Sequence, residues 1–298
     1  MSILVDKSSR VVVQGVTGKE GSFHTRSMRE YGTHVVAGVS PGKGGTSFEG
    51  IPVFNSLASA VANTGADTSI IFVPPAFAAD SIYEAIEDQL KVTVCVTDGI
   101  PIQEMMLIKQ KLKESNTVLI GSNCPGLITP GEAKLGIMPS HIFKKGPIGV
   151  ASRSGSLSYE VVFGLTERGI GQSTVVGVGG DGVKGTNFTD LLPMFEADPE
   201  TEVIVLIGEI GGADEEQAAQ YIKSKITKPV VSYIIGASAP SGKKMGHAGT
   251  IITHGKGTYQ SKIHALQEAG VHLARTPLEV AEIVEEISKG KQLKSQAN

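Results

Sequence analysis

Short runs of β-branched and other apolar residues alternate along the first part of the chain with segments of helical periodicity. The apolar runs are RVVVQ, HVVAGV, SIIFV, VTVCV and TVLI. Between two of them, Ile82, Ile86 and Leu90 recur at the spacing that lines one face of a helix. Runs that are apolar throughout are typical of strands buried on both faces of a parallel sheet. The pattern predicts a doubly wound α/β domain over residues 1–122.

A second alternating series follows a segment of a different kind. Residues 123–147 are dense in glycine and proline and show little periodicity, which predicts a functional loop and an interdomain joint. After it, apolar runs alternate with helical segments such as the one marked by Leu157, Val161 and Leu165. These runs are PIGVAS, STVVGV, TEVIVLIGE, PVVSYII and GVHLAR. The sequence therefore predicts a second α/β domain over residues 148–298.

Composition narrows the classes of function. The chain of 298 residues has a formal net charge of -3, so it lacks the basic excess that a nucleic-acid or anionic-membrane partner would require. Its two cysteines, Cys95 and Cys124, have no metal-ligand spacing, which predicts a reducing compartment and no metal on this chain. The sequence has no signal core, transit-peptide pattern or apolar run of membrane length. We expect a soluble, cytoplasmic protein, or a mitochondrial-matrix protein if a transit peptide has been removed.

The first glycine-rich loop, VVVQGVTGKEG, follows a strand and opens a helix. Gly15, Gly18 and Gly21 would present backbone amides and a helix N-terminus to a phosphate. The spacing is G-x-x-G-x-x-G, whereas the dinucleotide fingerprint is G-x-G-x-x-G. The loop favours a nucleotide-like ligand, and a simple packing turn remains the alternative.

The end of the second strand discriminates between nucleotide-like ligands. In HVVAGVSPGKGG, Ser40 and Lys43 occur where an NAD site would place an acidic residue for the ribose hydroxyls. A lysine suits a phosphate, which favours NADP or coenzyme A over NAD. A solvated loop lysine is the alternative.

Three motifs in the second half carry candidate chemistry. VASRSGSLSYE runs from a strand into a helix whose first turn holds Ser154, Gly155 and Ser156. This helix N-terminus could bind an anion, or the serine could simply cap the helix. VLIGEIGG places Glu209 just past an apolar strand, where a carboxylate could orient an imidazole. In KKMGHAGTII, small neighbours leave space around His247, which is either catalytic or only a loop residue.

Other polar residues in strand-end loops allow a structural interpretation as well. Asn123 and Asp181 follow predicted strands, and either could be functional or structural. Cys124 could be a nucleophile, but nothing in the sequence pairs it with a base, so packing is the favoured interpretation.

Taken together, the motifs resemble the alpha subunits of the succinyl-CoA synthetase (succinate-CoA ligase) family. The resemblance rests on GVTGKEG, PGKGG, GSNCPGLITPGE, GIMPSHIF, SRSGSLSYE, GEIGG and GKKMGHAG, which occur in this order over nearly the whole chain. It implies an α/β fold with a Rossmann-type CoA-binding domain followed by a flavodoxin-like ligase domain. It also implies that coenzyme A binds at Thr17, Gly18, Lys19, Glu20, Lys43, Val96, Thr97 and Asp98.

For the second domain, the resemblance implies phosphoryl transfer. His247 would carry the phosphoryl group with Glu209 beside it. The helix start at Ser154 and Gly155 would receive that group, and Tyr159 would lie near the substrate. The implied reaction converts succinyl-CoA, phosphate and a nucleoside diphosphate reversibly to succinate, CoA and a nucleoside triphosphate, as in the citric acid cycle.

The sequence contains no G-x-x-x-x-G-K-[ST] loop for a nucleotide. The resemblance implies that a beta subunit of ATP-grasp fold supplies this site, with Mg²⁺, in an alpha-beta dimer or a dimer of such dimers. A malate-CoA ligase, an ADP-forming acyl-CoA synthetase subunit, an NADP-dependent oxidoreductase and a non-catalytic CoA-binding module remain alternatives. The chain departs from the family pattern at Asp98, where glutamate is usual, and at Gly182 and Ser122, where proline is usual.

Overall fold

The computed structural model describes residues 2–239, 246–252 and 257–296. The chain divides into two compact units. The N-terminal unit consists of Leu4–Ser140 and Val176–Thr186, and the C-terminal unit consists of Met1–Ile3, His141–Val175 and Asn187–Asn298. The domain boundaries predicted at 122 and 147 stay predictions, because compactness defines spatial units and not folding domains.

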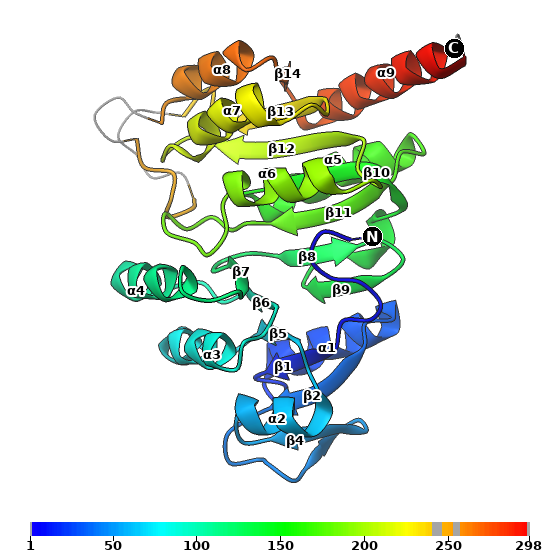
Figure 1. Ribbon diagram of the computed structural model, residues 1–298. Coiled ribbons are helices and arrows are strands. Elements are labelled where there is room, and N and C mark those ends of the chain that lie inside the picture. Colours follow the sequence, from blue (N-terminus) through cyan, green and yellow to red (C-terminus); the bar gives the residue numbers. More distant parts are fainter. Residues whose placement is uncertain (1, 240–245, 253–256, 297–298) are drawn as a thin grey trace. The chain divides into compact units, whose positions relative to one another are not determined.

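The N-terminal unit is built on a parallel sheet with the strand order β3-β4-β2-β1-β5-β6-β7 (Figure 1). Strand β3 pairs antiparallel with β4 at one edge. The parallel strands alone follow the order 3-2-1-4-5-6, which is that of the Rossmann fold. The elements are β1 (Val11–Gln14), α1 (Lys19–Tyr31), β2 (Val35–Val39), β3 (Ser47–Phe48), β4 (Ile51–Phe54), α2 (Leu57–Thr64), β5 (Thr68–Ile71), α3 (Pro75–Glu87), β6 (Val92–Cys95), α4 (Ile102–Leu112) and β7 (Val118–Gly121).

Apolar burial and helix-end residues explain these elements. All four residues of β1 are buried, as expected for a central strand that is covered on both faces. Ser56 caps α2 by accepting a hydrogen bond from the backbone N–H of Ser59. Helix α1 ends at Gly32, whose φ of 103° places it in the left-handed region. The predicted face of Ile82 and Ile86 lies in the core together with Met105 and Ile108 of α4.

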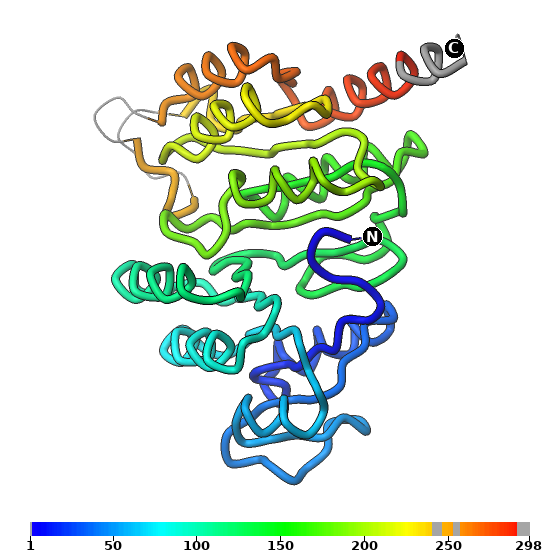
Figure 2. Tube along the Cα trace, in the orientation of Figure 1, coloured from blue at the N-terminus to red at the C-terminus, as the bar shows by residue number. Residues whose placement is uncertain are grey.

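In the C-terminal unit, the strands lie in the order β14-β13-β12-β10-β11. When β10 to β14 are numbered 1 to 5 and the sheet is read from β11, the strand order is 2-1-3-4-5. This is the order of flavodoxin-like folds. Helix α5 packs against α9, and α7 packs between α6 and α8; Figure 2 traces this part of the chain in green to red. The elements are β10 (Lys145–Ser152), α5 (Gly155–Glu167), β11 (Gln172–Gly177), α6 (Phe188–Ala197), β12 (Val203–Glu209), α7 (Asp214–Lys225), β13 (Val230–Ile235), α8 (Tyr259–Glu268), β14 (His272–Ala274) and α9 (Pro277–Gln296).

The glycine- and proline-rich segment is more ordered than a loop. It contains an antiparallel hairpin of β8 (Gly126–Thr129) and β9 (Ala133–Gly136). A Cβ atom on Gly126 would lie 1.9 Å from the carbonyl oxygen of Leu135. The glycine therefore permits a close approach of two strands. In the sequence, a glycine placed for this reason cannot be told from a glycine in a loop. The role of this segment as an interdomain joint stays a prediction.

The predicted fold class is confirmed. The chain is α/β with two sheets of mainly parallel strands, and their orders are those of a Rossmann-type and a flavodoxin-like fold. In such sheets, ligands bind at the carboxyl ends of the strands where the strand order reverses. These points lie between β1 and β5 in one unit and between β10 and β12 in the other.

Candidate active site

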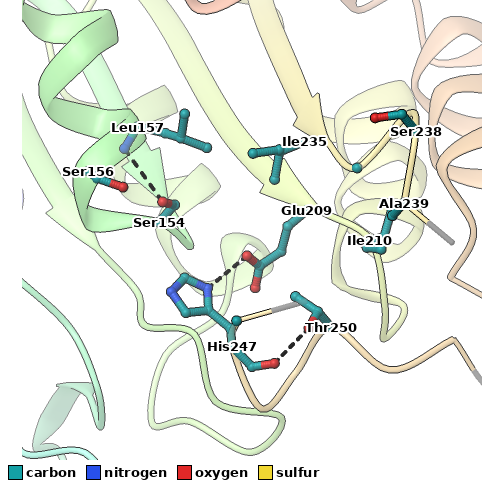
Figure 3. A pocket seen from close by; sticks show the side chains of 12 residues that line it. Ser154, Ser156, Leu157, Glu209, Ile210, Ile235, Ser238, Ala239, His247 and Thr250 are labelled. Carbon is teal, nitrogen blue, oxygen red and sulfur yellow. Dashed lines mark hydrogen bonds and ion pairs between the residues drawn. The ribbon is translucent and has the colours of Figure 1, made fainter. Parts of the chain in front are cut away.

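The reversal point between β10 and β12 brings His247 and Glu209 together. Glu209 is the last residue of β12, and its side chain is 4% exposed. Nδ1 of His247 lies 2.8 Å from Oε2 of Glu209. In Figure 3, Nε2 lies on the edge of the ring that faces away from this carboxylate. A carboxylate accepts hydrogen bonds only, so Nδ1 carries the proton and the neutral ring keeps its lone pair on Nε2.

The histidine opens onto a cavity of about 570 Å³. Glu209 and His247 line this cavity with Ser154 and Ser156, which belong to the start of α5 (Figure 3). The side chain of Ser154 caps α5 and accepts a hydrogen bond from the backbone N–H of Leu157. Because the N-terminus of a helix carries a partial positive charge, the cavity suits an anionic group.

The segment that carries His247 is held against the loop after β12. The backbone N–H and the hydroxyl of Thr250 both donate to the carbonyl oxygen of His247. A Cβ atom on Gly211 would lie 2.3 Å from the carbonyl oxygen of Gly249, so a glycine is needed for this close contact. The small residues beside the histidine thus permit tight packing of two backbones. Residues 242–245 of the GKKMGHAG motif lie outside the described residues.

A group of buried charged side chains adjoins the pair. Nη2 of Arg153 lies 3.1 Å from Oε1 of Glu209, and Nη1 lies 3.0 Å from Oε1 of Glu215. Lys262 pairs with the other oxygen of Glu215 and with Glu216. Burial lowers the pKa of Arg153, but the carboxylates of Glu215 and Glu209 outweigh it and hold that pKa above its ordinary value. The guanidinium is therefore charged whenever the protein is folded.

Sequence reasoning missed this group. Arg153 lies within the quoted motif SRSGSLSYE, directly after strand β10. Arginine is rarely fully buried unless it is paired, so the sequence favoured an exposed side chain. Glu215 and Lys262 lie on α7 and α8, and their encounter depends on how these helices pack. A charged residue directly after an apolar strand is the one signal that could have pointed to Arg153.

A second cavity, of about 490 Å³, lies at the reversal point of the N-terminal unit. Thr17 and Lys43 line it, as do Ser40, Asn55 and Phe77. The hydroxyl of Thr17 donates to Oγ of Ser40 at 2.9 Å. Asn55, which sequence reasoning missed, accepts a hydrogen bond from the backbone N–H of Gly44 and so orders the Lys43 loop.

The glycine-rich loop after β1 is packed closely. A Cβ atom on Gly21 would lie 2.1 Å from the carbonyl oxygen of Gly15, and Gly15 itself has a φ of 89°. These glycines let the loop turn tightly into α1, whose N-terminus begins beside the cavity wall at Thr17. A phosphate would meet backbone N–H groups and a positive helix end at this point.

The other predicted CoA-binding residues belong to two segments, of which only the first directly follows a residue of the cavity wall, Thr17. Gly18 is the N-cap of α1, and Lys19 and Glu20 begin that helix. Val96, Thr97 and Asp98 follow β6, and the hydroxyl of Thr97 donates to the carbonyl oxygen of Val73, which lines the cavity. Tyr159 lies on α5, further from its start than Ser154 and Gly155. The ligand roles of all these residues stay predictions.

The remaining sequence candidates form internal contacts. Asp181 accepts a hydrogen bond from Ser122 at 2.6 Å and one from Asn123 at 3.1 Å. A proline at position 122 could not donate the first of these, so the departure at Ser122 has a structural effect. Cys124 is buried, burial raises its pKa, and its thiol donates to the carbonyl oxygen of Cys95. The structure favours the packing interpretation for Cys124.

Two further properties concern the described residues as a whole. None of the described helices is long and apolar enough to cross a membrane. Across residues 2–239, 246–252 and 257–296, no group of three or more His, Cys, Asp or Glu residues is placed to hold a metal ion.

Comparison with known proteins assigns the family. Residues 6–99 match the CoA binding domain model, and residues 151–272 match the CoA-ligase model. The succinate-CoA ligase [ADP-forming] alpha subunit of Aquifex aeolicus is 56% identical over 97% of this chain and 95% of its own length. Alpha subunit 2 of the same ligase from Archaeoglobus fulgidus is 54% identical over 96% of this chain and 100% of its own length.

The chain belongs to the family of succinate-CoA ligase alpha subunits. The resemblance carried by the sequence motifs is thereby confirmed. The family models also confirm the predicted order, a CoA-binding domain followed by a CoA-ligase domain. The two cavities lie one in each matched region, since Thr17 and Lys43 fall in the first and Ser154 and Glu209 in the second.

A solved structure shares the fold of this ligase-family chain. The structure of ATP citrate lyase from Methanothrix soehngenii in complex with citrate and coenzyme A superposes with a TM-score of 0.90 at 23% identity. The superposition covers 98% of this chain and 51% of that one. The family's two-domain α/β fold thus also occurs within a longer chain.

Proposed function

We propose that this chain is the alpha subunit of a succinate-CoA ligase that transfers a phosphoryl group through His247. The observation that carries the proposal is the contact between Nδ1 of His247 and Oε2 of Glu209 at 2.8 Å, on the wall of a cavity at the start of α5. Family membership supports the substrates, since the relatives are named as succinate-CoA ligase subunits.

The proposed reaction has three steps. Inorganic phosphate attacks the thioester carbon of succinyl-CoA, the carbon–sulfur bond breaks, and succinyl phosphate and CoA form. Nε2 of His247 then attacks phosphorus, a nitrogen–phosphorus bond forms, and the bond between phosphorus and the carboxylate oxygen breaks to release succinate. Finally a terminal oxygen of a nucleoside diphosphate attacks phosphorus, and the imidazole leaves. Covalent catalysis divides one difficult transfer into easier ones.

The residues of the cavity fit these roles. Glu209 accepts a hydrogen bond from Nδ1–H and so leaves the lone pair of the neutral ring on Nε2, the atom that must attack. When phosphorus is bound at Nε2 the ring becomes positively charged, and the buried carboxylate of Glu209 stabilises that charge. The N-terminus of α5 at Ser154 and Gly155 would bind the phosphoryl oxygens. Tyr159 is proposed to lie near the succinate.

Coenzyme A is the proposed ligand of the second cavity. The Lys43 side chain and the N-terminus of α1 suit its phosphates, while Val39, Val73 and Phe77 offer apolar contacts to its adenine. The residues present therefore fit the molecule. Gly18, Lys19, Glu20, Val96, Thr97 and Asp98 are proposed to complete the site. Binding of NADPH, but not of CoA, would instead favour an oxidoreductase.

A beta subunit is the proposed partner. It would supply an ATP-grasp nucleotide site with Mg²⁺, since the sequence contains no G-x-x-x-x-G-K-[ST] loop. An alpha-beta dimer or a dimer of such dimers is the proposed assembly. We also propose a cytoplasmic location, which the two buried free cysteines support, because reduced thiols are typical of that compartment.

The test is an assay of the purified chain alone and together with a succinate-CoA ligase beta subunit. The chain alone should form no acyl-CoA from nucleoside triphosphate, CoA and succinate, and the mixture should form succinyl-CoA. Malate and monocarboxylic acids in place of succinate test the alternative ligases. Turnover by the chain alone, or preference of the mixture for another acid, would contradict the proposal.

A further inference from the structure

Arg153 contacts the side chain of Glu209 and the backbone segments next to Glu209 and His247. Its side chain is 2% exposed, and Nη2 lies 3.1 Å from Oε1 of Glu209. Nη1 donates to the carbonyl oxygen of Gly211 at 3.1 Å, in the loop that follows Glu209. Nη2 also donates to the carbonyl oxygen of Gly249 at 3.4 Å, in the segment that bears His247. One guanidinium therefore links the carboxylate, its loop and the histidine segment.

Glu209 depends on this guanidinium for the position of its carboxylate. Oε2 faces the histidine, whereas Oε1 is buried and accepts no hydrogen bond from the described residues. The charge that compensates Oε1 is Arg153, through an ion pair. A buried carboxylate oxygen without that cation would have no compensating partner, so the side chain would turn toward other donors. That turn would move the acceptor that keeps the proton of His247 on Nδ1.

Arg153 is itself held from the opposite side. Its Nη1 donates to Oε1 of Glu215 at 3.0 Å, and the same oxygen accepts the backbone N–H of Glu209 at 3.1 Å. The other carboxylate oxygen of Glu215 is paired with Lys262. A planar, forked guanidinium can bind two carboxylates and the carbonyl oxygens of Glu209, Gly211 and Gly249 in fixed directions. A lysine ammonium, in contrast, is a compact point charge.

We propose that Arg153 is a positioning residue for phosphorylation of His247. It holds the carboxylate of Glu209 in the direction of Nδ1, and through Glu209 it keeps the ring oriented at the cavity. This inference rests on the proposed function of His247, and it concerns a residue that touches neither the histidine side chain nor the phosphoryl group.

The test is a double-mutant cycle on the complex with a beta subunit, using the rate of labelling from a γ-labelled nucleoside triphosphate. Arg153→Lys should slow labelling by about tenfold to a hundredfold, the range expected for a small misplacement of a catalytic group. In the Glu209→Gln background, the same change should alter the rate by less than about threefold, because its effect passes through Glu209. Equal effects in both backgrounds would overturn the proposal.

Arg168→Lys is the matched control, since it is the same chemical change in the same unit. Arg168 caps α5 at the opposite end from Ser154 and pairs with Glu282 at 3.3 Å. The complex that contains Arg168→Lys should be labelled at the wild-type rate. If Arg153→Lys labels as fast as Arg168→Lys, the proposal is wrong. Failure of the wild-type complex to label would instead refute the proposed function.

A second measurement does not depend on phosphoryl transfer. With ¹⁵N-labelled histidine in the full chain, His247 should give the nitrogen shifts of a ring protonated at Nδ1. Arg153→Lys should give a mixture of both tautomers, and unchanged shifts would contradict the inference. If Arg153→Lys does not fold, Arg153→Met combined with Glu209→Gln removes both partners together. It should label at the rate of Glu209→Gln alone, and a tenfold difference would overturn the proposal.

Discussion

Nδ1 of His247 lies 2.8 Å from Oε2 of Glu209, although the two residues belong to different segments that meet at the carboxyl end of β12. In the proposed reaction, this contact leaves Nε2 as the ring nitrogen that attacks phosphorus. Because the side chain of Glu209 is 4% exposed, bulk water does not compete with His247 for the hydrogen bond to this carboxylate.

Replacement of Glu209 by glutamine should slow phosphorylation of His247 by about tenfold or more, because the neutral amide no longer stabilises the charged ring. The measurement is the rate of labelling in the complex with a beta subunit. Glu202→Gln is a suitable control, since Glu202 is exposed and directly precedes the same strand. Equal rates for wild type and Glu209→Gln would remove the carboxylate from the mechanism.

Charge reversal at Lys43 should weaken binding of coenzyme A by at least about tenfold, since Lys43→Glu replaces attraction to a phosphate with repulsion. Titration calorimetry of the full chain measures this, with Lys113→Glu as the control. Lys113 is exposed and lies at the end of α4. An unchanged CoA affinity in Lys43→Glu would show that Lys43 is not part of the site.

His24 should make the stability of the protein depend on pH. Burial and the nearby charge of Lys134 lower the pKa of His24 below its ordinary value of 6.5, although Glu20 opposes them. As the pH falls below 6.5, the unfolded chain takes up a proton before the folded chain does, so this contribution to stability is lost. It is fully present above that pH.

The free energy of unfolding in urea is measured for wild type and His24→Phe between about pH 5 and pH 7, the range in which histidine titrates. Phenylalanine keeps a ring against Phe72, on which His24 stacks at 5.4 Å. The variant should lose less stability than wild type on acidification. His264→Phe is the control for the same replacement at a surface position, since that side chain is 74% exposed. Equal slopes for all three proteins would contradict the prediction.

The sequence predicted the architecture well because burial has a clear periodic signal. The apolar run TEVIVLIGE became β12, and Ile82 and Ile86 lie in the core as their spacing predicts. The hairpin of β8 and β9 was missed, because Gly126 and Gly136 permit close strand contact but have the composition of a loop.

The candidate site was predicted only in part. His247 and Glu209 came from motifs that resemble a known family, and the structure brings their side chains together. Arg153 and Asn55 were missed, because their roles depend on contacts that folding creates, with Gly211 and Gly44 respectively. A sequence does not show which of its many polar side chains are turned inward.

The measurement that tests the central claim most directly is the chemical stability of the labelled protein. The complex incubated with γ-labelled nucleoside triphosphate should acquire label that is lost in acid and retained in alkali, as a phosphoramidate is. An acyl phosphate on Glu209 would be labile in alkali, and a phosphoserine at Ser154 or Ser156 would survive acid.

His247→Asn keeps a polar side chain but has no nucleophilic ring nitrogen, so its label should vanish while CoA still binds. Thermal unfolding of the variant confirms that it is folded. The account predicts an acid-labile label in the wild type and none in the variant. Acid-labile label at the wild-type level in a folded His247→Asn complex would contradict it.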